Sequence, residues 1–224
     1  MTGSGITVLC GGLSGARLAL ALRQAGLDAV TTLVTNVGDD WWVGELKVCP
    51  DTDAVLYALA GIFDEERGWG IRGDSFPGPR PGEPSWFSLG LRDRAHHERR
   101  TRYLRAGLSL TQATALLAQD LGVRARVLPV TDGEMPTVVV TDHGPAGFQE
   151  WLVRDRAAPR VRDVAWPTAV RCPPAPGVLE AIAAADVVVL ASSSPVASLD
   201  AVLAVPGVRS EEHTSELQSL RHLV

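Results

Sequence analysis

The amino-acid sequence predicts an α/β protein built on a doubly wound, mostly parallel sheet. Three observations favour this fold class. Short apolar segments rich in β-branched residues alternate with segments of helical spacing. A glycine-rich turn joins the first apolar segment to the first helical one, and polar residues follow several apolar segments. The length of 224 residues allows one large domain or two small ones with a substantial buried core.

The first half of the chain alternates strand and helix. Its predicted elements are a strand over 6–10, a helix over 16–25, a strand over 30–35 and a helix over 53–60. Gly26 is placed to end the first helix, because glycine commonly follows a helix C-terminus. Asp51 or Thr52 is available as the N-cap of the second helix. Residues 68–84 form a loop rich in Gly, Pro and Arg, with a length typical of functional or mobile segments.

The second half continues in the same manner. Its predicted elements are helices over 94–106 and 109–120, strands over 127–131 and 137–141, a helix over 176–185, a strand over 186–191 and a helix over 196–203. The turn at 132–136 is expected to pair the two strands on either side of it. Residues 186–191 have the clearest pattern of a buried parallel strand in the chain. Together these elements predict a Rossmann-like, doubly wound α/β fold with a mostly parallel sheet and a helical insertion.

The composition argues against several classes of protein. A net charge of -5, from 21 basic and 26 acidic side chains, argues against a general nucleic-acid binder. No apolar run reaches the roughly 18 to 20 residues of a membrane span, and no basic N-terminal segment indicates a signal peptide. Cys10, Cys49 and Cys172 are odd in number and include no CxxC pair, which indicates reduced thiols in a cytoplasmic protein.

The last residues differ in character from the rest of the sequence. From Arg209 onward, the periodic α/β pattern gives way to a polar string that resembles the translation of a sequencing adapter. We therefore expect a Rossmann-like domain over 1–208, incomplete at its C-terminal end, and a non-native tail over 209–224. A short polar C-terminal helix is the alternative interpretation of this string.

The turn Gly11-Gly-Leu-Ser-Gly15 joins the first strand to the first helix. Backbone N–H groups at such a helix N-terminus bind phosphate, and Gly11, Gly12 and Gly15 let a ligand approach the backbone closely. Arg17 adds a positive charge. We predict a phosphate site here, although the glycines would also be needed for a tight turn alone. The turn matches neither a Walker A loop nor the spacing G-x-G-x-x-G.

Two acidic segments follow. Asn36-Val-Gly-Asp-Asp40 comes after the second strand, and Asp51-Thr-Asp53 lies one loop later. Four carboxylates near a phosphate repel one another unless a cation compensates them. Mg2+ that bridges carboxylates and phosphate oxygens is therefore the predicted cofactor. The alternative is that Asp51 and Asp53 only favour a helix N-terminus.

Three further segments are binding candidates. Ser192-Ser-Ser194, after the last predicted strand, offers hydroxyl groups to a phosphate or a base. Trp41 and Trp42 follow the acidic turn, where they stack on a flat heteroaromatic ligand or pack in the core. The basic segment 90–102 has the pattern of a solvated helix face. Its two adjacent histidines splay by about 100° on a helix, which argues against a shared zinc ion.

A series of blocks runs in order between residues 6 and 208. They are Gly11-Gly-Leu-Ser-Gly-Ala-Arg17, Asn36-Val-Gly-Asp-Asp40, Cys49-Pro-Asp-Thr-Asp53, Asp64-Glu-Glu-Arg-Gly-Trp-Gly70, Phe87-Ser-Leu-Gly90, Arg92-Asp93, Phe148-Gln-Glu150 and Pro176-Gly-Val-Leu-Glu180. Together these blocks resemble the 2-phospho-L-lactate transferase family, and most of all its actinobacterial, phosphoenolpyruvate-type branch. Leu91 and Ser194 depart from the family pattern, which has Asp and Asn at these positions.

The resemblance implies a Rossmann-like, Mg2+-dependent transferase of coenzyme F-420 biosynthesis. Such an enzyme moves a phospholactyl or phosphoenolpyruvyl group from a guanosine diphosphate-linked donor to the terminal hydroxyl of the deazaflavin Fo and releases GMP. The implied catalytic residues are Asp39 and Asp51, and the implied Mg2+ ligands are Asp40 and Asp51. By the same resemblance, Asp53 and Arg92 contact Fo. The other implied substrate-binding residues are Gly11, Gly12, Gly15, Arg17, Asn36, Ser192 and Ser194.

The sequence leaves some alternatives open. It does not decide between the lactate and enolpyruvate donors, or on the oligomeric state, for which a homodimer is one candidate. A related family of nucleotide-sugar-binding regulators shares the fold and the glycine-rich start. A dinucleotide-dependent oxidoreductase is a third interpretation, but the missing G-x-G-x-x-G and the four clustered carboxylates argue against it.

Overall fold

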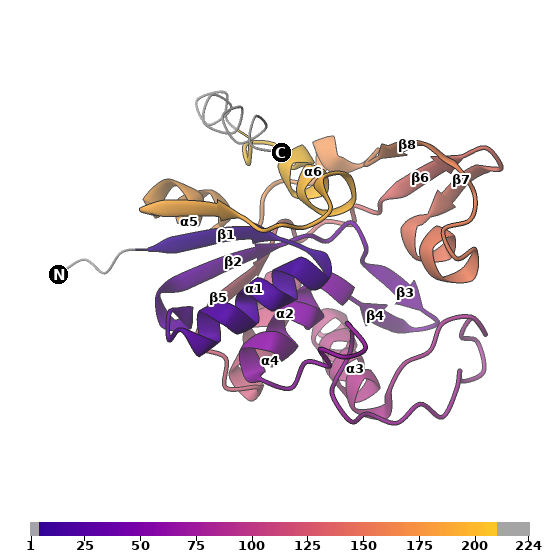
Figure 1. Ribbon diagram of the computed structural model, residues 1–224, viewed down its shortest axis with the longest axis horizontal. Coiled ribbons are helices and arrows are strands. Elements are labelled where there is room, and N and C mark those ends of the chain that lie inside the picture. Colours follow the sequence, from indigo (N-terminus) through magenta and orange to yellow (C-terminus); the bar gives the residue numbers. More distant parts are fainter. Residues whose placement is uncertain (1–4, 210–224) are drawn as a thin grey trace.

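The computed structural model describes residues 5–209 (Figure 1). A four-stranded sheet in the order β5-β2-β1-β9 lies at its centre, and each neighbouring pair of strands is parallel. These strands are β1 (Ile6–Cys10), β2 (Thr31–Thr35), β5 (Arg126–Pro129) and β9 (Val187–Leu190). The arrangement confirms the predicted α/β fold class. Residues 210–224 of the predicted tail lie outside the described residues.

Helices cover both faces of the sheet (Figure 1). On one face lie α1 (Gly12–Gln24), α2 (Pro50–Ala60) and α4 (Leu110–Asp120), and on the other lie α5 (Val178–Ala184) and α6 (Asp200–Ala204). Side chains alternate between the two faces of a strand. Val8 and Cys10 of β1 therefore join the first hydrophobic core, whereas Leu9 joins the second.

The other elements lie outside the central sheet and the helices that cover it. They are the helix α3 (Leu91–Arg105), the hairpin of β3 (Trp41–Val43) and β4 (Leu46–Val48), an antiparallel sheet of β6 (Val138–Thr141), β7 (Gly144–Gly147) and β8 (Val161–Ala165), and short 3-10 or π-helices at Asp28–Val30, Glu150–Arg154, Ala169–Arg171 and Pro195–Leu199. Among the described residues, no helix has the length and hydrophobicity needed to cross a membrane.

The predicted pairing of the strands at 127–131 and 137–141 is wrong. β5 pairs in parallel with β2, whereas β6 belongs to the separate antiparallel sheet β7-β6-β8. The burial patterns explain the difference. Val127 and Leu128 of β5 enter opposite cores, as expected of a strand covered on both faces. β6 instead alternates between buried and half-buried residues, as expected of an antiparallel strand with one solvated face.

Two other expectations need correction. β9 is parallel to β1, but it pairs with no second strand among the described residues, and Val187 and Val188 are 53% and 40% exposed. Neither Asp51 nor Thr52 is the N-cap of α2, because the helix begins at Pro50 and its N-cap is Cys49. Proline suits the first position of a helix, where its missing N–H has no partner to lose.

Candidate active site

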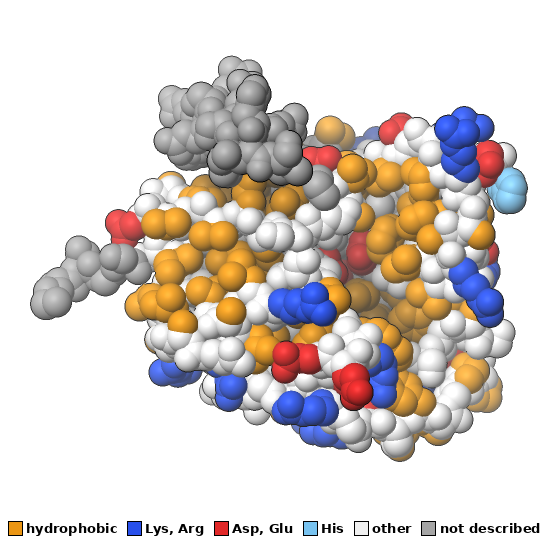
Figure 2. All heavy atoms as spheres, in the orientation of Figure 1, with side chains coloured by type: hydrophobic (Ala, Val, Ile, Leu, Met, Phe, Trp, Pro, Cys, Tyr) orange, Lys and Arg blue, Asp and Glu red, His pale blue; other side chains and the backbone are white. Residues whose placement is uncertain are grey.

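A cavity of about 680 Å³ opens at the carboxyl ends of β1, β2 and β9. The sheet order changes direction between β1 and β9, and ligands of open α/β sheets bind at this switch point. Figure 2 shows the surface hollowed here, with acidic side chains inside the hollow and hydrophobic side chains around it. One side of the cavity is polar and includes Ser14, Asp39, Asp51, Ser193 and Ser194.

The glycine-rich turn is packed too tightly for side chains. A Cβ atom on Gly11 would lie 2.5 Å from Oδ2 of Asp51 and 2.8 Å from Cβ of Ser198. Gly12 has a φ of +59°, which favours glycine. The first N–H groups of α1 start at this turn, and no side chain caps the helix. The Gly12 N–H interacts with the Asp51 carboxylate, and the N–H groups that follow it are available to a ligand in the cavity, as the predicted phosphate site requires.

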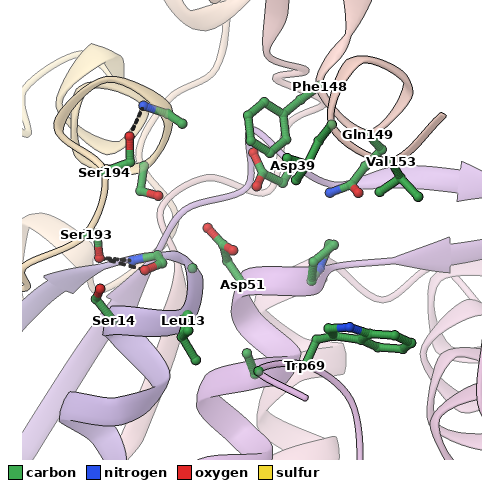
Figure 3. Close-up of a pocket in the computed structure, with 18 of the residues that line it drawn as sticks. Leu13, Ser14, Asp39, Asp51, Trp69, Phe148, Gln149, Val153, Ser193 and Ser194 are labelled. Carbon is green, nitrogen blue, oxygen red and sulfur yellow. Dashed lines mark hydrogen bonds between the residues drawn. The ribbon is translucent and has the colours of Figure 1, made fainter. Parts of the chain in front are cut away.

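Ser193 connects the turn after β1 to the turn after β9. Its Oγ accepts a hydrogen bond from the Gly11 N–H at 3.3 Å and donates one to the Gly11 carbonyl oxygen at 2.6 Å. This exchange holds the two polar turns together at the rim of the sheet (Figure 3). In the sequence Ser193 is only the middle residue of three consecutive serines, which gives no sign of this contact.

Gly11→Ala should weaken nucleotide binding by at least about tenfold and destabilise the fold by about 1–3 kcal/mol. The new methyl group would overlap Asp51 and Ser198, so the turn or α2 would have to move. Isothermal titration with GDP and thermal denaturation measure the two effects. Gly5→Ala is the control, because a Cβ there would meet its nearest atom at an ordinary 3.8 Å. Unchanged GDP affinity in Gly11→Ala would contradict a ligand site at this turn.

The four predicted carboxylates divide into two pairs. Asp39 and Asp51, the cavity pair, both line the cavity and point into the same space (Figure 3). Asp40 and Asp53, the buried pair, do not line it. All four residues are at most 8% exposed. The helix explains part of this division, because Asp51 and Asp53 lie two residues apart on α2 and therefore project about 200° apart.

The cavity pair has little compensation within the protein. Asn36 donates a hydrogen bond from Nδ2 to Oδ2 of Asp51 at 3.0 Å and is itself held by the Gly38 N–H. Oδ1 of Asp39 is buried without a hydrogen-bond partner. Burial raises the pKa of Asp39 well above its usual range, and the nearby Asp51 raises it further. Burial also raises the pKa of Asp51, although the Asn36 hydrogen bond opposes this effect.

The buried pair lies beside cations of the protein. Burial raises the pKa of Asp40 to about 7, and the charge of Lys47 opposes the rise. Burial alone would also raise the pKa of Asp53, but the Arg100 guanidinium outweighs it and holds that pKa well below the usual range. Arg100 contacts both carboxylate oxygens of Asp53 and is completely buried. Arg100 thus neutralises Asp53, whereas neither oxygen of the buried Asp40 has a hydrogen-bond partner, and Asp39 and Asp51 face the cavity.

The remaining predicted residues are dispersed. Ser194 lines the cavity, and its Oγ accepts a hydrogen bond from the Ala197 N–H. Gly15 packs against Cys10 beneath the turn, whereas Ser192 is exposed and does not line the cavity. Arg17 and Arg92 are also exposed outside the cavity lining, and Arg92 donates to the Arg72 carbonyl oxygen at 3.1 Å. These roles stay predictions.

The aromatic side of the cavity comes from residues to which the sequence gave no role. Trp69, Trp86 and Phe87 belong to the segment between α2 and α3, and Phe148 comes from the end of the antiparallel sheet. Trp41 does not line the cavity; it stacks on Trp86 with ring centres 5.3 Å apart. Trp41 therefore acts as a packing anchor for this wall. The only available signal was that Trp69, Phe87 and Phe148 lie within the blocks of family resemblance.

The cavity pair is the feature that fits a divalent cation. Within residues 5–209, no group of three or more His, Cys, Asp or Glu side chains is arranged to hold a metal ion. Mg2+, however, is commonly held by one or two carboxylates together with substrate phosphates. None of the described side chains that line the cavity is Lys, Arg or His. A phosphorylated ligand would therefore meet two carboxylates and no protein cation, which fits binding together with Mg2+.

Comparison with known proteins gives a consistent result. The family model described as 2-phospho-L-lactate transferase CofD matches residues 6–218. A protein of Nocardia farcinica named phosphoenolpyruvate transferase is 42% identical over 226 residues, which cover 96% of this chain and 68% of that protein. A Streptomyces coelicolor protein that is also named phosphoenolpyruvate transferase is 42% identical over 213 residues, which cover 91% of this chain and 67% of that protein.

A solved structure has the same fold. The crystal structure of a UPF0052 family member from Bacillus halodurans superposes with a TM-score of 0.64 at 20% sequence identity. The match covers 93% of this chain and 64% of that one, so this chain spans less than two thirds of the length of that protein. At this identity the likeness concerns the fold alone.

Proposed function

Because the chain belongs to the 2-phospho-L-lactate transferase CofD family, we propose that it transfers a phosphoenolpyruvyl group from a guanosine diphosphate-linked donor to the deazaflavin Fo. The names of the actinobacterial relatives support the enolpyruvyl donor over the lactyl one. The product would be a precursor of coenzyme F-420, with GMP as the leaving group. The cavity pair is the observation that carries this proposal, because two carboxylates lie beside a helix N-terminus at a cavity that no described Lys, Arg or His side chain lines.

In the proposed reaction, each bond that forms is matched by one that breaks. The terminal hydroxyl oxygen of Fo forms a new bond to the phosphorus that carries the enolpyruvyl group. The bond from that phosphorus to the bridging oxygen of the diphosphate breaks, and GMP leaves with the oxygen. The hydroxyl proton would pass to a carboxylate oxygen of the cavity pair, which faces the space that the substrates would occupy.

The residues of this chain would divide the work. The N–H groups that begin α1 would hold the donor phosphates, since transfer of a phosphoryl-type group depends on positioning and charge neutralisation. Asp39 and Asp51 would hold Mg2+, which when bound neutralises charge on the diphosphate. Asp40, one of the ligands expected from sequence, lies outside the cavity lining, so Asp39 takes its place in this proposal. Trp69, Trp86 and Phe148 offer flat surfaces to the deazaflavin ring.

Removal of Mg2+ should abolish GMP release. The test incubates the full chain with Fo and the guanosine diphosphate-linked donor, with Mg2+ or with excess EDTA, and follows GMP by chromatography. Release should require both Fo and Mg2+, and restored Mg2+ should recover the rate. Donor without Fo is the control for simple hydrolysis. Tight GDP binding with no transfer to Fo would contradict the proposal and favour a nucleotide-binding regulator.

A further inference from the structure

The segment between α2 and α3 begins with a closed loop over residues 63–71. Phe63 and Ile71, at its two ends, form an antiparallel bridge, and both side chains are buried in the first hydrophobic core. One step further into the loop, the Asp64 N–H donates a hydrogen bond to the Gly70 carbonyl oxygen at 3.1 Å. The base of the loop is therefore held both by packing and by backbone hydrogen bonds.

Arg67, inside this loop, contacts two aromatic rings. Its guanidinium carbon lies 4.3 Å from the ring centre of Phe76 and 5.1 Å from that of Trp69. The two rings also meet edge to face, with their centres 5.4 Å apart. A guanidinium within about 6 Å of an aromatic ring is attracted by the electrons of the ring face. Arg67 therefore links Trp69 to Phe76, which lies further along the same segment.

Asp64 fixes the direction of Arg67. Its Oδ1 accepts a hydrogen bond from the Arg67 N–H at 2.9 Å, and its Oδ2 lies 3.5 Å from Nη1 of the guanidinium. The side chains of Asp64 and Arg67 are only 11% and 31% exposed. The guanidinium thus has a carboxylate as one partner and two rings as the others, which is more than a solvated surface arginine needs.

Trp69 is the residue at which this loop reaches the cavity. It lines the aromatic side of the cavity, and it is 45% exposed, so part of its ring is free to meet a ligand (Figure 3). Arg67 and Phe76 do not line the cavity. Arg67 is therefore placed to influence a bound ring through Trp69 and not by direct contact.

We propose that Arg67 is a positioning residue, which holds the Trp69 ring in place as a stacking surface for the acceptor. This inference rests on the proposed function, in which the acceptor is the flat deazaflavin Fo. A flat ligand gains most from stacking on a ring that is already oriented, because less conformational freedom is lost on binding. The phosphates of GDP would lie at the N-terminus of α1, so GDP affinity should not depend on Arg67.

The first test is Arg67→Met, which keeps an unbranched apolar side chain but removes the charge. The KM for Fo should rise by about 3- to 10-fold, while kcat at saturating Fo and the KM for the donor stay within about twofold. Trp69→Ala removes the stacking surface itself and should raise the KM for Fo by at least about tenfold. A rise in the KM for the donor alone would show that Trp69 stacks on guanine, and it would overturn the proposal.

A double variant shows whether Arg67 acts through Trp69. In a Trp69→Ala chain there is no indole left to hold, so the addition of Arg67→Met should change the KM for Fo by less than about twofold. Arg67→Lys keeps a cation near the rings, and its effect should be smaller than that of Arg67→Met. Effects of Arg67→Met and Trp69→Ala that multiply in the double variant would contradict the proposed role of Arg67.

The fluorescence of Trp69 tests the positioning without any ligand. Its emission is the difference between the wild-type chain and Trp69→Phe, and it is measured in the same way in the Arg67→Met background. Acrylamide should quench Trp69 more readily in Arg67→Met, because the guanidinium no longer covers the ring. Equal quenching would overturn the proposal. A wild-type chain that binds no Fo would refute the proposed function, and the quenching result would then decide the positioning role by itself.

Arg80→Met is the matched control. Arg80 belongs to the same segment between α2 and α3, pairs with Glu98 at an exposed site and does not line the cavity. It should change neither the KM for Fo nor the quenching of Trp69, and thermal denaturation shows whether each variant is folded. A loss of Fo affinity as large in Arg80→Met as in Arg67→Met would assign the effect to the segment as a whole and refute a specific role of Arg67.

Discussion

Asp51→Asn should lower kcat for GMP release by about 10²- to 10⁴-fold. The side chain is placed both to accept the hydroxyl proton and to share Mg2+ with Asp39, and losses of this size follow removal of a positioned base or of one electrostatic group. The shape of the residue is unchanged, and Asn36 can still reach its side-chain oxygen. GDP affinity in EDTA should therefore not fall. Removal of the negative charge should relieve its repulsion with Asp39 and stabilise the metal-free protein slightly.

The measurement is single-turnover GMP release at saturating donor, with thermal denaturation in EDTA on the same samples. Asp120→Asn is the control, because Asp120 is an exposed carboxylate at the end of α4 that pairs with Arg99. It should leave kcat unchanged. An Asp51→Asn variant with at least half the wild-type kcat would show that the cavity pair has no catalytic role.

The sequence was sufficient to predict the fold class and the strands β1, β2 and β9 of the central sheet. Apolar β-branched runs separated by helices determine the parallel strands, and the turn after β1 is where an α/β fold binds its ligand. It was not sufficient to place β5 and β6, because both are short apolar runs beside a turn. The strand with which each of them pairs is determined by contacts between residues that are far apart in the sequence. One such contact is the hydrogen bond from the Val130 N–H to the Thr35 carbonyl oxygen.

The candidate site was predictable in its position but not in its charge balance. In the sequence the four aspartates form one acidic group that would need an external cation. The 200° separation of Asp51 and Asp53 could have been derived from helix geometry alone. That Arg100 would neutralise Asp53 could not be derived in this way, because α3 reaches α2 only through the tertiary fold. The exposed basic face expected for residues 90–102 contains the fully buried Arg100 for the same reason.

Arg100→Met should lower the free energy of unfolding by about 3–5 kcal/mol, the usual cost of leaving one charge of a buried pair without its partner. Asp53 would lose the guanidinium that contacts both its oxygens, and its neighbours His96 and His97 could replace that interaction only if they became protonated. Urea denaturation measures the change as a shift in midpoint at constant slope. Asp120→Asn, which removes an exposed carboxylate that makes no contact with Asp53 or Arg100, should change the unfolding free energy by less than about 0.5 kcal/mol.

The double variant Asp53→Leu with Arg100→Met separates the cost of a lone charge from the cost of lost packing. Removal of both charges leaves no buried ion without a partner, and such replacements are often neutral or stabilising. The double variant should therefore recover at least half of the stability that Arg100→Met loses, which a double-mutant cycle would report as a coupling energy of about 2 kcal/mol or more. A double variant as unstable as the sum of the single losses would contradict this account. The stability of α2 would then depend on the shape of Arg100 and not on its charge.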